Sequence, residues 1–151
     1  GAQVEVTHTG GATRWDVFSD VHDHGNGSVK TNAEGKWSIK EVLQHLIDCE
    51  RIMCYRALCI GRKDKTALPG FEENDYAPEA NAHARTLGQL VAEAQRLRQT
   101  TIDLFTSFTA DMLQRKGTAN KNLVSVINIG YIIAGHETHH RNVLKERYLK
   151  S

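Results

Sequence analysis

Two histidines near the end of the sequence have the spacing of a pair of metal ligands. His136 and His140 lie four residues apart in the stretch A-G-H-E-T-H-H-R, so on a helix they project from one face, one turn apart. That face is otherwise apolar, because it also carries Val126, Ile129, Ile133, Val143 and Leu144. An apolar face of this kind is normally buried. Because a buried polar group without a partner costs roughly 2–7 kcal/mol, a shared metal ion is the expected partner of both imidazoles.

The expected third ligand is His45, which lies on a different helix. The segment Ser38–Glu41 fits a capping box, and the apolar spacing that follows predicts a helix from about Ser38 to Ile60, ended at Gly61. His45 lies on the shoulder of its apolar stripe, a position that by itself is more typical of a core-edge histidine than of a ligand. At 1.5 Å per residue, His45 is about 10 Å from the N-terminal end of its helix. The centre of the 136/140 pair is about 16 Å from the C-terminal end of the last helix, against about 22 Å from its other end. In an antiparallel arrangement His45 and the 136/140 pair lie at similar depths, about 10 and 16 Å from the same end of the bundle, whereas a parallel arrangement gives about 10 and 22 Å. The depths therefore favour antiparallel helices.

Three imidazole ligands would leave coordination positions open on the ion. This pattern is typical of a catalytic rather than a structural metal site. A metal bound in this way can acidify a water or a thiol, or polarise a carbonyl. Both Zn²⁺ and Ni²⁺ suit imidazole ligands, so the sequence predicts a divalent transition metal without choosing between them.

The rest of the chain predicts an all-α protein, with an antiparallel four-helix bundle as the simplest architecture. A second capping box at Thr86–Gln89 begins a helix that runs to about Ser107 or Met112, and the last helix is predicted at 122–149. Residues 62–85 are rich in turn-forming residues and predict a long connection without regular structure, a kind of segment that is often functional. The glycine-rich residues 1–33 predict an irregular N-terminal segment, in which only 13–21 could form a short helix, followed by a bundle domain over 34–151.

Composition and charge exclude several classes of partner. With 151 residues, of which 40% are hydrophobic and 25% charged, the chain is most simply a single globular domain. A net charge of +1 without a dense basic tract indicates no nucleic-acid or anionic-membrane partner. No apolar run is long enough for a membrane span, and the first residues lack the pattern of a secretory signal. Three cysteines, five residues apart on one predicted helix, cannot pair with one another and favour a reducing compartment, so we expect a cytoplasmic protein.

Two other interpretations of the histidine pair remain open. Residues 136–140 also match H-E-x-x-H, the zinc-peptidase pattern in which Glu137 would activate water. Such peptidases usually take a third ligand downstream, where only Glu146 is available. Alternatively, His136 and His140 bind core carboxylates or water and no metal at all.

In its histidines and predicted helices, the chain resembles the DinB/YfiT-like superfamily of metalloenzymes. The similarity lies in Gly35–Asp48, in Glu50-Arg51 with Tyr55-Arg56, in the loop Leu68–Phe71 and in the run Ile133–His140. The resemblance implies a four-helix bundle with an up-down-down-up path and a metal triad of His45, His136 and His140. It also implies thiol-dependent S-transferase or isomerase chemistry with a small-molecule substrate and a low-molecular-weight thiol, often in a homodimer. The chain differs from the family at residues 1–33, where members begin with a long amphipathic helix.

Two functions from different classes follow. The first is a metal-dependent enzyme that activates a small thiol. Asp48 could orient a ligand imidazole, Glu137 could serve as a base, and Cys49 could approach the metal, although each of the three is also typical of a structural role. The second is a non-enzymatic metal-binding or stress-response protein. Residues that position a substrate would separate the two, and the candidates for binding a carboxylate are Arg51, Arg56 and Arg141.

Overall fold

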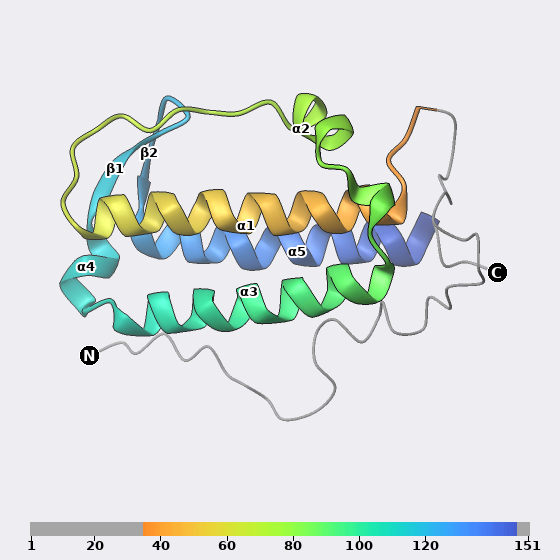
Figure 1. Cartoon of the computed structure of the whole chain (residues 1–151). Coiled ribbons are helices and arrows are strands. Elements are labelled where there is room, and N and C mark those ends of the chain that lie inside the picture. Colours follow the sequence, from red (N-terminus) through yellow and green to blue (C-terminus); the bar gives the residue numbers. More distant parts are fainter. Residues whose placement is uncertain (1–34, 148–151) are drawn as a thin grey trace.

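Three long helices lie side by side and form the body of the protein. The structure is a computed structural model that describes residues 35–147. Its long helices are α1 (Ile39–Gly61), α3 (Leu87–Ser107) and α5 (Val126–Arg147). α1 packs against both of the others. Figure 1 shows that α5 runs antiparallel to α1, whereas α3 runs in the same direction as α1. The antiparallel relation of α1 and α5 agrees with the expectation from the histidine depths.

Both predicted capping boxes are present and fix where α1 and α3 begin. The Ser38 hydroxyl accepts a hydrogen bond from Glu41 N, and the Glu41 carboxylate accepts one from Ser38 N at 2.7 Å. Thr86 and Gln89 form the same reciprocal pair at α3. These side chains satisfy backbone N–H groups that have no partner within the helix.

The buried residues form two apolar clusters along the bundle. One cluster includes Leu43, Ile47, Leu90 and Leu144, and so joins α1, α3 and α5 near the N-terminal end of α1. The other joins the opposite end of the bundle through Ile60, Phe108, Val126, Ile129 and Ile133. Polar residues lie between the two clusters, as described below.

The chain between α3 and α5 differs from the prediction, because the last helix begins later than expected. It forms α4 (Ala110–Gln114) and a hairpin of β1 (Lys116–Ala119) and β2 (Asn122–Ser125), paired antiparallel. The prediction that the last helix begins at 122 was therefore wrong, since α5 begins at Val126. The reason is local: Asn120 and Lys121 both have positive φ, the conformation of a tight two-residue hairpin turn. Ser125 then accepts a hydrogen bond from Asn128 N at the start of the helix.

The connection between α1 and α3 is more ordered than its turn-rich sequence predicted. It carries α2 (Glu73–Glu79) and a short 3-10 helix, η3 (Ala82–Ala84). Leu68 pairs with the β1–β2 hairpin, and Arg56 on α1 donates a 2.8 Å hydrogen bond to the Pro69 carbonyl. The segment thus runs along α1 from one end of the bundle to the other (Figure 1).

The expectations for residues 1–33, and for the end of the last helix at 149, lie outside the described residues. Within residues 35–147, none of the helices combines the length and the apolar character that a membrane crossing requires.

Candidate metal centre

Three imidazoles from α1 and α5 meet through their Nε2 atoms. His45 Nε2 lies 3.0 Å from His136 Nε2, and His140 Nε2 lies 3.0 Å from the same atom. The ring centroids of the three are 4.6–5.0 Å apart, and the rings meet edge to face. The predicted ligands on two distant stretches of sequence therefore reach one point, and they form a group that could hold a metal ion.

This arrangement suits an ion better than hydrogen bonds between the rings. The Nε2 of a neutral imidazole offers either one proton or one lone pair, so His136 cannot form two good hydrogen bonds with its two neighbours. Ligand nitrogens that are each about 2.0–2.1 Å from one ion lie about 3 Å apart when their directions are near a right angle. The observed separations of 3.0 Å fit that requirement.

The surroundings keep the three imidazoles neutral. Burial, followed by the nearby rings of His136 and His140, lowers the pKa of His45 to about 4. Burial and the neighbouring His136 and His139 lower the pKa of His140 to about 4, and burial also lowers the pKa of His136. Neutral imidazole is the form that binds a metal, so these side chains are ready to bind at neutral pH.

Trp37 and Cys49 enclose His45. The Trp37 and His45 ring centroids are 4.9 Å apart, and Cys49 Sγ lies 3.5 Å from His45 Nδ1. Burial, together with the charges of Glu73 and Asp48, raises the pKa of the Cys49 thiol to about 12, so this thiol is protonated at neutral pH. Cys49 thus approaches the site, as the sequence suggested.

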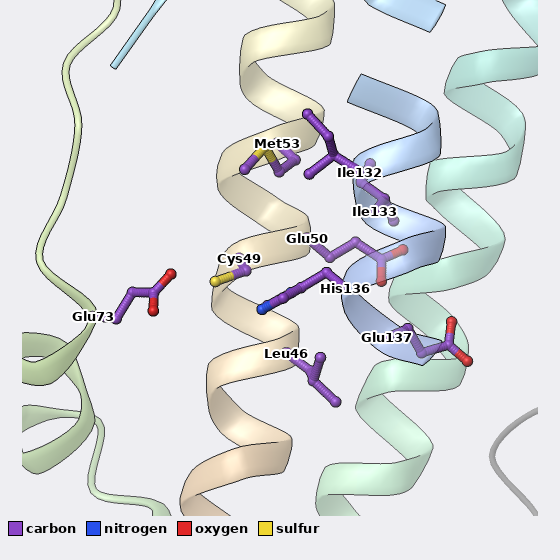
Figure 2. Close-up of a pocket in the computed structure, with 9 residues that line it drawn as sticks. All are labelled: Leu46, Cys49, Glu50, Met53, Glu73, Ile132, Ile133, His136 and Glu137. Atoms are coloured by element: carbon purple, nitrogen blue, oxygen red, sulfur yellow. The ribbon is translucent and has the colours of Figure 1, made fainter. Parts of the chain in front are cut away.

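The two carboxylates predicted to assist the site have other contacts. Asp48 accepts a 2.9 Å hydrogen bond from Gln44 Nε2. The Glu137 carboxylate is buried and forms an ion pair with Arg98 at 2.6 Å. Figure 2 shows the Glu137 carboxylate directed toward α3, whereas the ring of its neighbour His136 points to the other side of α5. The structure therefore brings His45, His136 and His140 together and places the Glu137 carboxylate away from them.

A buried ionic network that the sequence did not predict joins the three long helices. Arg98 on α3 binds both oxygens of Glu50 on α1, at 2.8 and 3.0 Å, and also binds Glu137 on α5. Thr101 donates a 2.7 Å hydrogen bond to Glu50. Burial disfavours the charged guanidinium, but its bonds to Glu50 and the charge of Glu137 outweigh this and raise the pKa of Arg98 above its usual range.

A cavity of about 210 Å³ opens beside the histidines. Its polar lining residues are His136, Glu50, Glu73 and Glu137 (Figure 2). The remaining walls are Leu46, Cys49, Met53, Ile132 and Ile133. A small, mostly apolar molecule would therefore lie in contact with one edge of the triad.

The three arginines considered for substrate binding do not line this cavity. Arg51 forms an ion pair with Glu93 at 2.7 Å, and Arg56 lies 5.9 Å from the centroid of the Phe71 ring. The buried Nε of Arg141 has no hydrogen-bond partner among residues 35–147. Phe71 in turn packs against Tyr76, so these aromatics attach the connection to α1.

The fold and the site together define a helical-bundle protein with a centre of three histidines, of which His45 is buried and His136 and His140 are partly buried. A family model described as the DinB superfamily matches residues 21–144, and the chain belongs to this family. The structure is similar to that of YfiT from Bacillus subtilis, with a TM-score of 0.74 and 17% sequence identity over 91% of this chain and 81% of that one. YfiT is described as a probable metal-dependent hydrolase with an unusual four-helix bundle topology. These matches confirm the predicted family and the all-α four-helix bundle. Among curated proteins, the comparison finds no significant match.

Replacing Arg98 tests the ionic network. Arg98→Met leaves two buried carboxylates without their shared cation and should lower the free energy of unfolding by about 3–5 kcal/mol. Adding Glu137→Gln should recover part of this loss, because one uncompensated charge is removed. Arg96→Met, at an exposed position of the same helix, is the control and should change stability by less than about 0.5 kcal/mol in urea unfolding. Equal stability of the Arg98 and Arg96 variants would contradict the assigned role.

The pKa values of the triad predict how the metal-free protein responds to pH. His45 and His140 protonate near pH 4 in the folded protein but near their ordinary 6.5 when unfolded. Between these values the unfolded state binds more protons, so the free energy of unfolding falls as the pH decreases below about 6.5. The urea midpoint of chelator-treated protein should therefore fall from pH 7 to pH 5.

The same titration with His45→Leu should show a smaller fall, since one buried imidazole is absent. His83→Gln, which changes a half-exposed histidine, should retain the wild-type slope. Identical midpoints for the wild type at pH 7 and pH 5 would contradict the burial of neutral imidazoles.

Proposed function

We propose that the protein is a metal-dependent enzyme that activates a small thiol and transfers it to an electrophilic substrate. The observation that carries the proposal is the convergence of the Nε2 atoms of His45, His136 and His140 beside a cavity of small-molecule size. These three side chains would hold a divalent transition metal, with Zn²⁺ and Ni²⁺ both suited to imidazole.

The donor set supports catalysis rather than a structural metal. Structural zinc sites are closed by four protein ligands, whereas catalytic sites use three and keep a position open. When bound here, such an ion would lower the pKa of a thiol and hold the resulting thiolate. The three side chains would hold the ion through neutral nitrogens, since burial lowers the pKa of each imidazole.

The cavity supports a small substrate with an apolar body. Leu46, Met53, Ile132 and Ile133 supply apolar walls, and His136 forms part of the same lining. An electrophilic carbon of a bound molecule would therefore lie near the triad and away from bulk water. Proximity of this kind can contribute several kcal/mol to a bimolecular transfer.

The contacts of Glu137 weigh against the zinc-peptidase interpretation. In that pattern the glutamate activates water beside the metal, but Glu137 is in an ion pair with Arg98 between the helices. The roles assigned to Glu137 as a base and to Asp48 as an orienting acid remain predictions.

Hydrolysis of a small substrate is the second candidate. It is favoured by the similarity to YfiT, which is described as a probable metal-dependent hydrolase. The same open position could hold water in place of a thiol. A non-enzymatic metal-binding protein is the remaining alternative, and the activity test below separates the three.

The proposal includes a cytoplasmic homodimer without a nucleic-acid or membrane partner. Cys49, Cys54 and Cys59 are all free thiols in the structure, which is consistent with a reducing compartment. The dimer rests on the resemblance to the family.

Metal-dependent activity tests the proposed function. Protein reconstituted with zinc or nickel should conjugate a small thiol to 1-chloro-2,4-dinitrobenzene, and a chelator should reduce the rate at least about tenfold, because removing the ion removes the acidified thiol. His136→Ala should have the same effect, while His139→Ala, at an exposed neighbouring position, should retain activity.

Three other outcomes are informative. Equal rates with and without chelator would contradict a metal-dependent transferase. Metal-dependent cleavage of a nitrophenyl ester without added thiol would support the hydrolase. Metal binding without either reaction would support the non-enzymatic alternative.

A further inference from the structure

A fourth potential ligand lies on α2, next to one histidine of the triad. Glu73 is the first residue of this helix and lines the cavity together with His136. Figure 2 shows its carboxylate directed across the cavity toward Cys49 and His136. A carboxylate oxygen of Glu73, a ring nitrogen of His45 and Cys49 Sγ all lie within 4.8 Å of one another. Glu73 is thus close to a member of the triad.

Glu73 differs from the other two carboxylates of the cavity. Glu50 and Glu137 are buried and share Arg98. Glu73 is exposed, and within residues 35–147 its carboxylate has neither a hydrogen bond nor a salt bridge. An anionic side chain that lies within 4.8 Å of a ring nitrogen of His45 and is not held by a cation of the protein is suited to bind a metal held by the triad, once it moves toward His136 and His140.

We propose that Glu73 is the fourth protein ligand of the metal centre, and that α2 acts as a tethered lid that carries it. This inference rests on the metal site of the proposed function and extends it. The resting centre would then be closed by three histidines and one carboxylate from a different segment of the chain. A substrate would reach the metal only after the carboxylate is displaced.

The attachment of α2 agrees with this role. The side chain of Ala77 in α2 is buried. Before α2, Leu68 is buried and donates a backbone hydrogen bond to Thr118; after α2, Ala82 is buried. Glu73 itself lies on the exposed part of the helix. Its carboxylate can therefore approach or leave the triad by side-chain rotation and a small shift of α2.

Cys49 is less suitable for the fourth position. Its Sγ lies 3.5 Å from His45 Nδ1 and 3.7 Å from His45 Nε2. A sulfur almost equally distant from both nitrogens does not lie along the direction in which Nε2 presents its lone pair, where the ion must be.

The proposal also predicts which kind of substrate group could displace Glu73 from the metal. A soft ligand such as a thiolate is preferred by zinc and related metals over a carboxylate oxygen. A small thiol could therefore displace Glu73, whereas a neutral oxygen ligand would compete poorly with it. The carboxylate would thus favour thiols over weaker ligands.

Cobalt binding to the full chain tests the proposal. Co²⁺ is titrated into metal-free wild type, Glu73→Gln, Glu79→Gln and Cys49→Ser, and azide is then added to each cobalt form. Glu73→Gln should weaken cobalt binding at least about tenfold, because even the loss of a residue that only contacts a ligand typically costs 10–100-fold. The same variant should bind azide at least about threefold more tightly, because the internal competitor is absent. Glu79→Gln, an exposed glutamate at the other end of α2, should match the wild type in both measurements.

Every other outcome overturns the proposal. Unchanged cobalt affinity in Glu73→Gln, or weaker cobalt binding without a gain for azide, would show that Glu73 is not a ligand, while the three-histidine site would still stand. A sulfur-to-cobalt charge-transfer band that disappears in Cys49→Ser would assign the fourth position to the cysteine. Wild-type protein that binds no cobalt would overturn both the inference and the proposed function. Circular dichroism checks that each variant is folded.

Discussion

The structure depends on three imidazoles, one buried and two partly buried, whose nitrogens converge and need a common partner. His45, His136 and His140 point their Nε2 atoms at one another from two helices, and burial keeps all three neutral. Hydrogen bonds among them leave at least one nitrogen poorly satisfied, whereas a single cation satisfies all three. The antiparallel relation of α1 and α5, and the depth at which the two helices meet, bring these three nitrogens together.

The network around Arg98 holds the helices at that depth. It crosses the bundle between the two apolar clusters and connects α1, α3 and α5 through one guanidinium, two carboxylates and a hydroxyl. A buried ionic layer often contributes little net stability compared with apolar packing. Its geometry is nevertheless specific, because a shift of one helix turn would separate Arg98 from Glu50 or Glu137. We infer that the network keeps His45 in register with His136 and His140.

The sequence was most informative where a pattern is local. The capping boxes and the spacing of apolar residues predicted α1 and α3, and the four-residue interval predicted that His136 and His140 share a face. The β1–β2 hairpin was missed because four residues such as Asn122–Ser125 are too few to reveal a period of two. Glu50 was visible as a charged residue in an apolar stripe, but its partner Arg98 is 48 residues away. Glu73 lies in a turn-rich segment with no periodicity, so only the folded arrangement brings it within 4.8 Å of a ring nitrogen of His45.

Metal content of the wild type and of His45→Ala tests the central claim most directly. Histidines from both α1 and α5 are expected to bind the same ion, so purified wild-type protein reconstituted with zinc or nickel should hold about one ion per chain. His45→Ala should lose most of that metal, although the residue is 91 positions away from His136. His83→Ala, outside the site, should retain it. Full metal occupancy in His45→Ala would contradict a shared site, and the absence of metal from the reconstituted wild type would contradict the metal centre itself.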